Sequence, residues 1–302
     1  MRIFAICIVR DEVDILEKTI IAALEWADKV IIADHNSCDG TWELIDEKLR
    51  YLDGVEVYGK IYDKFNDGLR SNVYNKYKHL AELGDWWCRL DSDEFYIDNP
   101  KEFLRKVGDK YNVIRGAKFQ YYFTEKDVEN YNRYPENYLN GNSVDNLKYY
   151  VCNESETRFV RHLNQDWKEG NLWPNSMWPH LIYQEHIRLK HFQYRYPEQI
   201  QHRIDLRTAI RKESDIFNHE VRGNWNKRIS NSGKIDQSSK IIQFEQTWKD
   251  RIIQSENLSF DDDSEYVIRH DLLISKIKPT LFQIIRNTMF FLCGRGKRIP
   301  TR

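Results

Sequence analysis

The first ninety residues alternate between short apolar runs and amphipathic stretches, and no other feature of the chain constrains its fold as much. Strand-like apolar runs occupy residues 3–9, 29–34, 55–59 and 86–90, and helical patterns occupy residues 13–26, 41–52 and 70–83. Continuous apolar runs are typical of parallel strands covered on both faces. The alternation therefore predicts an α/β fold, a Rossmann-like, mostly parallel sheet flanked by helices, with right-handed crossovers.

Composition narrows the class of protein. The chain has 302 residues, enough for one large domain or a domain with an appendage. Its 46 basic and 47 acidic residues nearly balance, which gives no case for nucleic acid as a partner. The five cysteines are widely spaced, so the sequence predicts neither a zinc site nor a disulfide framework, and a reducing cytoplasm is expected. No apolar stretch is long enough to span a bilayer, and the seven-residue run at 3–9 is expected to be a strand rather than a leader.

The pattern is less regular after Pro100. We expect a strand pair within 112–123, a polar insertion at 125–146, and further strands at 156–163 and 187–196. Pro197 opens a helical pattern to 217, followed by a loop at 218–239 and another helix at 240–257. These segments predict a catalytic domain over residues 1–197 and a helical C-terminal region over residues 198–302.

An acidic cluster follows the fourth apolar run. Asp91, Asp93 and Glu94 lie within four residues, and like charges this close favour a bound cation. Carboxylates one residue apart at a strand end suit Mg²⁺ or Mn²⁺ carrying a diphosphate. The alternative interpretation is a solvated acidic turn.

A second polar loop, residues 34–40, follows the second run. Ligands of open parallel sheets bind at the carboxyl ends of the strands, so both loops should face one crevice. No G-x-G-x-x-G follows the first run, which argues against a dinucleotide or methyl-donor site.

Four stretches together resemble the GT-A glycosyltransferases, specifically the family-2-like branch with a D-x-D-E-F motif. They are ICIVRDEVDILEKTI, VIIADHNSCDGT, DWWCRLDSDEFY and LKHFQYRYPEQIQHRIDLR, and they span roughly the first 210 residues. The resemblance implies a GT-A fold and a metal-dependent, inverting glycosyltransferase of the hexosyltransferase type. Its donor would be a UDP- or GDP-sugar and its acceptor a glycan or lipid-linked glycan, in surface polysaccharide or lipopolysaccharide synthesis.

The resemblance also assigns roles to residues of the donor site. Asp34 would accept from the base, Asp39 would shape the same pocket, and Arg10 and Glu12 would bracket the base. Their alternatives are turn or capping acids and a surface ion pair. Arg70 would contact the nucleotide, with a solvated helix residue as the alternative.

The metal site follows from the same motifs. Asp93 would ligate Mn²⁺ or Mg²⁺ directly, and Asp91 would contact the ribose or the metal through water. Glu94 would orient the loop. His191 would be the third ligand unless it is structural.

Two further roles complete the implied reaction. Arg195, with Lys190 beside it in the motif, would neutralise the departing diphosphate. An inverting reaction needs a carboxylate base, and the candidates are Asp166, Glu169 and Glu185. Trp173 and Trp178 would form an acceptor platform, or else pack in the core.

The C-terminal segment 276–302 is basic and amphipathic. It predicts peripheral contact with an anionic inner membrane leaflet; a helix packed on the domain or on a second subunit is the alternative.

Two other classes of function compete with a transferase. A nucleotidyltransferase or related nucleotide-processing enzyme should show an early Gly- and Lys-rich phosphate loop, which is not visible. A non-catalytic nucleotide-sugar-binding protein fits poorly with the intact acidic residues.

Overall fold

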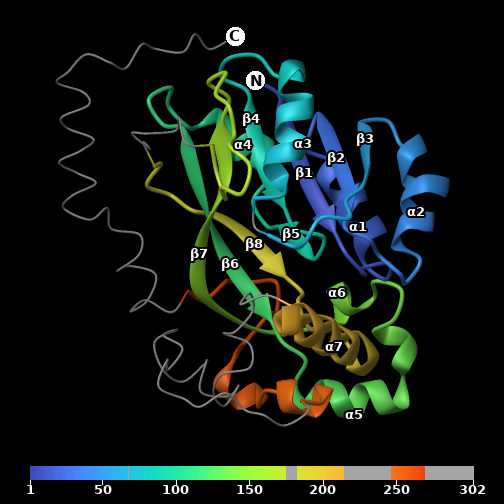
Figure 1. Ribbon diagram of the computed structural model, residues 1–302. Coiled ribbons are helices and arrows are strands. Elements are labelled where there is room, and N and C mark those ends of the chain that lie inside the picture. Colours follow the sequence, from blue (N-terminus) through green and yellow to red (C-terminus); the bar gives the residue numbers. More distant parts are fainter. Residues whose placement is uncertain (67, 175–181, 214–245, 269–302) are drawn as a thin grey trace. The chain divides into compact units, whose positions relative to one another are not determined.

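The computed structural model describes residues 1–66, 68–174, 182–213 and 246–268 (Figure 1). Two compact units are present. The first contains Met1–Ala117 and Ser155–Leu189, and the second contains Lys118–Glu154 and the described part of residues 190–275. Trp178, the expected loop at 218–239, the first part of the helix expected at 240–257 and the basic tail lie outside the described residues. The division at Pro197 stays a prediction.

The protein is a mixed α/β structure with a central sheet flanked by helices. The strands are β1 (Ile3–Val9), β2 (Lys29–Asp34), β3 (Val55–Lys60), β4 (Trp86–Leu90), β5 (Glu94–Tyr96), β6 (Val113–Tyr121), β7 (Tyr149–Arg161), β8 (Ile187–His191) and β9 (Ser259–Phe260). The helices are α1 (Leu16–Leu24), α2 (Thr41–Glu47), α3 (Arg70–Tyr77), α4 (Pro100–Arg105), α5 (Glu125–Arg133), α6 (Ser143–Asn146) and α7 (Pro197–Glu213). No helix in the described part of the chain is both long and apolar enough to cross a membrane.

The first four strands lie in the order β3-β2-β1-β4 and are all parallel, as the sequence predicts. The complete order is β3-β2-β1-β4-β7-β6-β8-β5, with β9 on β7. The strand order reverses at β1, because β2 lies on one side of it and β4 on the other. Such a reversal opens a crevice at the carboxyl ends of the two strands, where ligands of open sheets bind. The register pairs Cys7 with Leu90, so the loops after β1 and β4 begin side by side at these strand ends.

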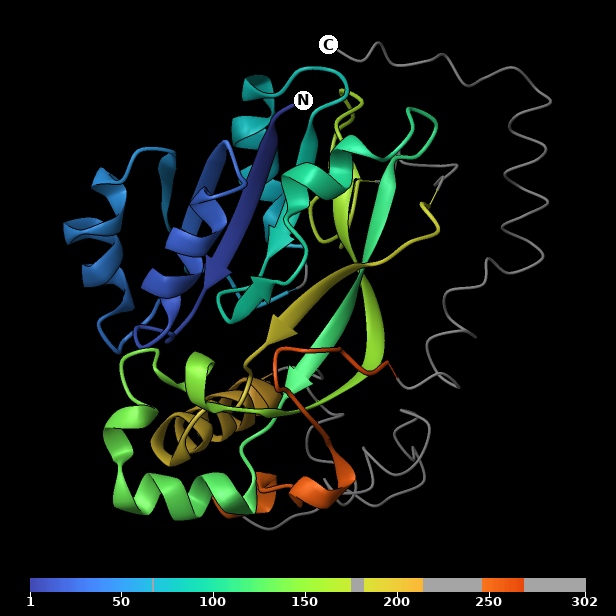
Figure 2. The same ribbon diagram turned by 180° about the vertical axis from the view of Figure 1, so that it is seen from behind.

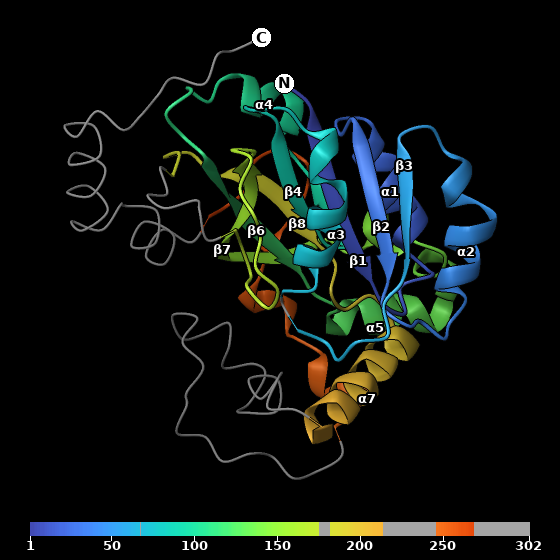
Figure 3. The same ribbon diagram turned by 45° about the horizontal axis from the view of Figure 1, so that its top comes forward.

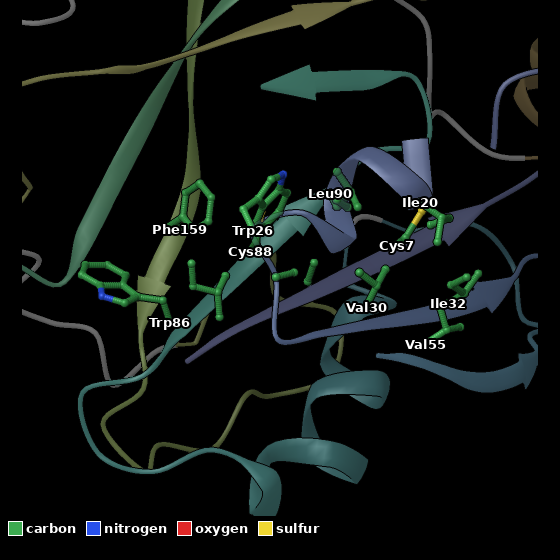
Figure 4. Packing of buried hydrophobic residues seen from close by; sticks show 14 of the residues in the cluster. Cys7, Ile20, Trp26, Val30, Ile32, Val55, Trp86, Cys88, Leu90 and Phe159 are labelled. Carbon is green, nitrogen blue, oxygen red and sulfur yellow. The ribbon is translucent and has the colours of Figure 1, made fainter. Parts of the chain in front are cut away.

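Helices cover both faces of the parallel strands. On one face, buried residues of α1 and α2 pack on β1, β2 and β4 in a cluster that includes Ile20, Ile32 and Leu90 (Figure 4). Helix α3 covers the other face (Figure 3). Its Val73 and Tyr74 pack there with alternate residues of the same strands. Figure 2 shows these strands from behind. Burial on both faces explains why the strands read as continuous apolar runs.

The later part of the chain departs from expectation at several points. Residues 113–121 form one nine-residue strand rather than a strand pair. The expected polar insertion at 125–146 contains α5 and α6, and α5 begins with a capping box between Thr124 and Asp127. Residues 246–257 form short 3-10 helices, at 248–251 and 255–257, instead of an α-helix. The predictions of a strand in 187–196 and of a helix from Pro197 are confirmed.

Candidate functional site

The loops after β1 and β2 are tied together by hydrogen bonds. Asp11 has a left-handed backbone with φ 53°, and its Oδ1 accepts from the Cys38 backbone N–H at 2.7 Å. Its own N–H donates to Ser37 Oγ at 3.0 Å, and the Glu12 N–H donates to Thr41 Oγ1 at 3.0 Å. Glu12 is 5% exposed, so it is a buried residue rather than a surface one. These bonds fix the two loops relative to one another.

Asp39 acts within this loop network. Its Oδ1 accepts from both the N–H and the Oγ1 of Thr41, at 2.9 and 2.6 Å, and its Oδ2 accepts from the Val13 N–H at 3.1 Å. Both carboxylate oxygens are therefore used in holding the start of α2 against the first loop. Contact of Asp39 with a nucleotide stays a prediction.

Asp34 is the last residue of β2 and is fully buried. Its Oδ2 accepts from the Ser37 N–H at 3.1 Å, whereas its Oδ1 has no hydrogen-bond partner among the described residues. A buried acceptor without a donor costs about 1–3 kcal/mol, so natural structures usually satisfy it. An N–H group of a bound molecule would satisfy this oxygen.

Asp91 follows β4 directly and binds three arginines. Its Oδ1 accepts from Arg70 Nη2 at 2.5 Å and lies 3.5 Å from Arg89 Nε, and its Oδ2 accepts from Arg158 Nη1 at 3.0 Å. Arg70 is the first residue of α3 and is only 8% exposed, so the alternative of a solvated helix residue is wrong. Burial alone would raise the pKa of Asp91, but the charges of Arg89, Arg70 and Arg158 outweigh it and hold that pKa well below its usual range.

Glu94 and Ser92, two other residues of the acidic turn, bind Arg158 and Thr19. Arg158 Nη2 lies 2.5 Å from Glu94 Oε1 and 3.1 Å from Glu156 Oε2. Thr19 of α1 donates from its Oγ1 to the Ser92 carbonyl at 2.5 Å. Glu94 therefore holds Arg158 in place, and its loop-orienting role stays a prediction.

A glycine on β6 makes room for Arg158. A Cβ on Gly116 would lie 2.8 Å from Arg158 Cγ and 2.5 Å from Leu189 Cδ2. Any larger residue at position 116 would therefore force the side chains of Leu189 and Arg158 to shift.

The carboxylates at this edge fit a divalent ion only in part. Within the described residues, no group of three or more His, Cys, Asp or Glu side chains could hold a metal. Both oxygens of Asp91 already bind guanidinium groups. Asp93 is a buried carboxylate two residues further on, and Mg²⁺ is commonly bound by one carboxylate together with substrate phosphates. Asp93 thus fits this mode of binding, whereas a shared Asp91–Asp93 pair does not.

Other predicted residues lie elsewhere in the structure. Asp166 is exposed and pairs with Lys78, which follows α3. Lys78 is eight residues from Arg70, so this pair is roughly 12 Å along the helix from the Asp91 end of α3. Glu169 and Glu185 have exposed side chains, and Arg10 is partly exposed, with its Nε 3.9 Å from Asp11 Oδ2.

The closing motif contributes to the second compact unit. His191 Nδ1 pairs with Gln120 Oε1 at 2.5 Å, and Lys190 Nζ pairs with Asp261 Oδ2 at 2.7 Å. Arg195 is fully buried and donates from Nη1 to the Phe192 carbonyl at 2.9 Å. A metal-binding role of His191 and a diphosphate-binding role of Arg195 stay predictions.

Arg89 and Arg158 are site residues that were not predicted from the sequence. Alternation in β4 places Arg89 and Asp91 on one face, which is a local signal. Arg158 is 67 residues from Asp91, and only the antiparallel pairing of β7 with β4 brings it there, with Cys88 opposite Phe159. That register is not readable from the sequence.

Comparison with known proteins gives structural neighbours only. No family model and no curated protein matches the chain. A mannosyltransferase from Pyrobaculum calidifontis, solved with GDP-Man and Mn²⁺, is 13% identical with a TM-score of 0.32, over 39% of this chain and 35% of that one. S. aureus TarS is 19% identical with a TM-score of 0.28, over 40% and 36%. GalNAc-T7, solved with UDP, GalNAc and Mn²⁺, is 11% identical with a TM-score of 0.39, over 65% and 44%. The chain thus spans less than half of the length of these three glycosyltransferase structures.

Proposed function

We propose that the chain transfers a sugar from a nucleotide-sugar donor to a glycan or lipid-linked glycan acceptor, with inversion at the anomeric carbon. The proposal extends to a role in the synthesis of a surface polysaccharide or lipopolysaccharide. The observation that carries it is the placement of two polar features at the reversal of strand order. These are the buried, unsatisfied carboxylate oxygen of Asp34 and the acidic turn at Asp91–Glu94 with its arginines.

Each feature suits one part of a nucleotide-sugar. Asp34 can accept from an N–H on the edge of the base. The guanidinium groups can bind phosphate oxygens, for which the planar fork of arginine is well matched. Asp93 would hold Mn²⁺ or Mg²⁺ together with the donor phosphates, and the ion would stabilise charge on the leaving diphosphate.

The transfer itself is a single displacement. The acceptor oxygen forms a bond to the anomeric carbon while the bond from that carbon to the phosphate oxygen breaks, and the nucleoside diphosphate leaves with the electron pair. The hydroxyl proton passes to a carboxylate base. Of the three expected candidates, Asp166 is engaged by Lys78, whereas Glu169 and Glu185 are exposed and form no ion pair with any residue that the structure describes.

Replacing Asp34 with asparagine is expected to weaken binding of UDP or GDP about tenfold. A hydrogen bond to a charged acceptor contributes about 1.5–3 kcal/mol, and the amide retains a weaker acceptor in the same shape. Isothermal titration calorimetry on wild type and Asp34→Asn measures the difference. Asp46→Asn is the matched control, because Asp46 lies on α2 and forms an exposed pair with Arg50. Equal affinity of all three proteins would remove Asp34 from the donor site.

A further inference from the structure

The arginines around Asp91 form a cluster in which some N–H donors have no acceptor among the described residues. The cluster consists of Arg70, Arg89 and Arg158, and it converges on one carboxylate. A guanidinium group carries five N–H donors, and the Nε atoms of Arg70 and Arg158 are buried without a hydrogen-bond partner among the described residues. The two side chains are 9% and 1% exposed, so water does not readily satisfy these donors.

Solvent reaches the cluster on the side of Asp91. The Asp91 side chain is 24% exposed and that of Arg89 is 19% exposed, whereas Arg158 is held from behind by Glu94, whose side chain is fully buried. Asp91 is therefore the acceptor that an incoming anion would meet first. Glu94 and Glu156 would keep Arg158 in position if Asp91 moved.

Charge balance supports the same conclusion. The three arginines pair with three carboxylates, those of Asp91, Glu94 and Glu156, so these six side chains together carry no net charge. A divalent cation bound to Asp91 would lie close to the three positively charged guanidinium groups that pair with this carboxylate, and they would repel it. A phosphate group would instead find cationic donors, since it can take over the bonds that Asp91 accepts.

We propose that Arg70, Arg89 and Arg158 form a diphosphate subsite, and that Asp91 is its internal counterion, displaced by the phosphates rather than acting as a metal ligand. This rests on the proposed function for the identity of the ligand, a nucleoside diphosphate. The subsite itself is defined by the arginines and binds pyrophosphate without a metal ion.

A counterion role and a metal-ligand role of Asp91 predict opposite changes in pyrophosphate affinity for Asp91→Asn. In EDTA, loss of the competing charge raises the affinity for inorganic pyrophosphate at least fivefold over wild type, because the phosphates no longer displace a carboxylate. A metal ligand or ribose contact predicts equal or weaker binding in this variant. Calorimetry at constant ionic strength measures the affinities, and equal or weaker binding by Asp91→Asn overturns the proposal.

A second variant covers the case in which Asp91→Asn does not fold. Arg89 is the most exposed arginine of the cluster, and Arg89→Gln lowers the pyrophosphate affinity at least tenfold in EDTA. Arg50→Gln, which removes an exposed arginine from its partner Asp46, leaves the affinity within twofold of wild type. An Arg89→Gln protein that binds like wild type overturns the proposal.

Failure of this inference is distinguishable from failure of the proposed function. If nucleotide-sugars bind only with Mn²⁺ and pyrophosphate does not bind in EDTA, the subsite is wrong while the transferase proposal stands. If pyrophosphate shows the expected pattern but no nucleotide-sugar binds, the subsite stands and the transferase proposal falls.

Discussion

Replacing Arg158 with methionine is expected to lower the free energy of unfolding by about 3–5 kcal/mol. The side chain is 1% exposed and pairs with Asp91, Glu94 and Glu156. Removing one partner from buried ion pairs leaves uncompensated charge in the interior, and this has a cost of that size. Urea denaturation of wild type and Arg158→Met, followed by circular dichroism, measures the change.

A control and a rescue variant separate charge from packing. Arg50→Met removes an arginine from an exposed i,i+4 pair with Asp46, and its expected loss is below about 0.5 kcal/mol. Adding Glu94→Gln to Arg158→Met removes one uncompensated charge, so the double variant is expected to be more stable than Arg158→Met alone. A loss under about 1 kcal/mol in Arg158→Met would contradict the role given to this arginine.

Replacing Asp93 with asparagine is expected to reduce release of nucleoside diphosphate from the donor at least about 100-fold. Removing one group that stabilises charge on a leaving group typically costs a factor of this size. The amide preserves the shape of a buried side chain but binds a divalent cation far less well. A coupled assay of nucleoside diphosphate release, run over a range of Mn²⁺ concentrations, measures the effect.

Asp46→Asn is again the matched control, because it changes an exposed carboxylate on the same compact unit. Its rate is expected to stay within twofold of wild type. A rate of Asp93→Asn within threefold of wild type, at saturating Mn²⁺, would rule out the metal-holding role of this residue.

The parallel half of the sheet was predictable from the sequence because local signals determine it. The apolar runs at β1, β2 and β4 have the bounds expected from the sequence, since strands buried on both faces leave an uninterrupted apolar record. The later strands were less predictable. Residues 112–123 were expected to form a strand pair, but residues 113–121 are one strand, in which Gly116 permits the close approach of Arg158.

The carboxylates of the candidate site were predictable from the sequence, whereas the arginines that bind Asp91 were less predictable. Asp34 and Asp91 follow apolar runs directly, so their placement at the strand ends follows from the strands themselves. Two partners of Asp91, Arg70 and Arg158, depend on how α3 and β7 pack, and Arg158 reaches it through a pairing between distant segments. The start of α5, within the expected polar insertion, was not predicted. The capping-box spacing of Thr124 and Asp127 is the sequence signal for it.

The most direct test of the transferase account is nucleoside diphosphate release by the wild-type chain from a panel of UDP- and GDP-sugars. The panel is measured with Mn²⁺ and with EDTA, and calorimetry under the same conditions reports donor binding. We expect at least one donor to bind and to be cleaved with Mn²⁺, and we expect binding, but not full activity, to persist in EDTA. Absence of both binding and release for every donor, with the protein folded, would contradict it.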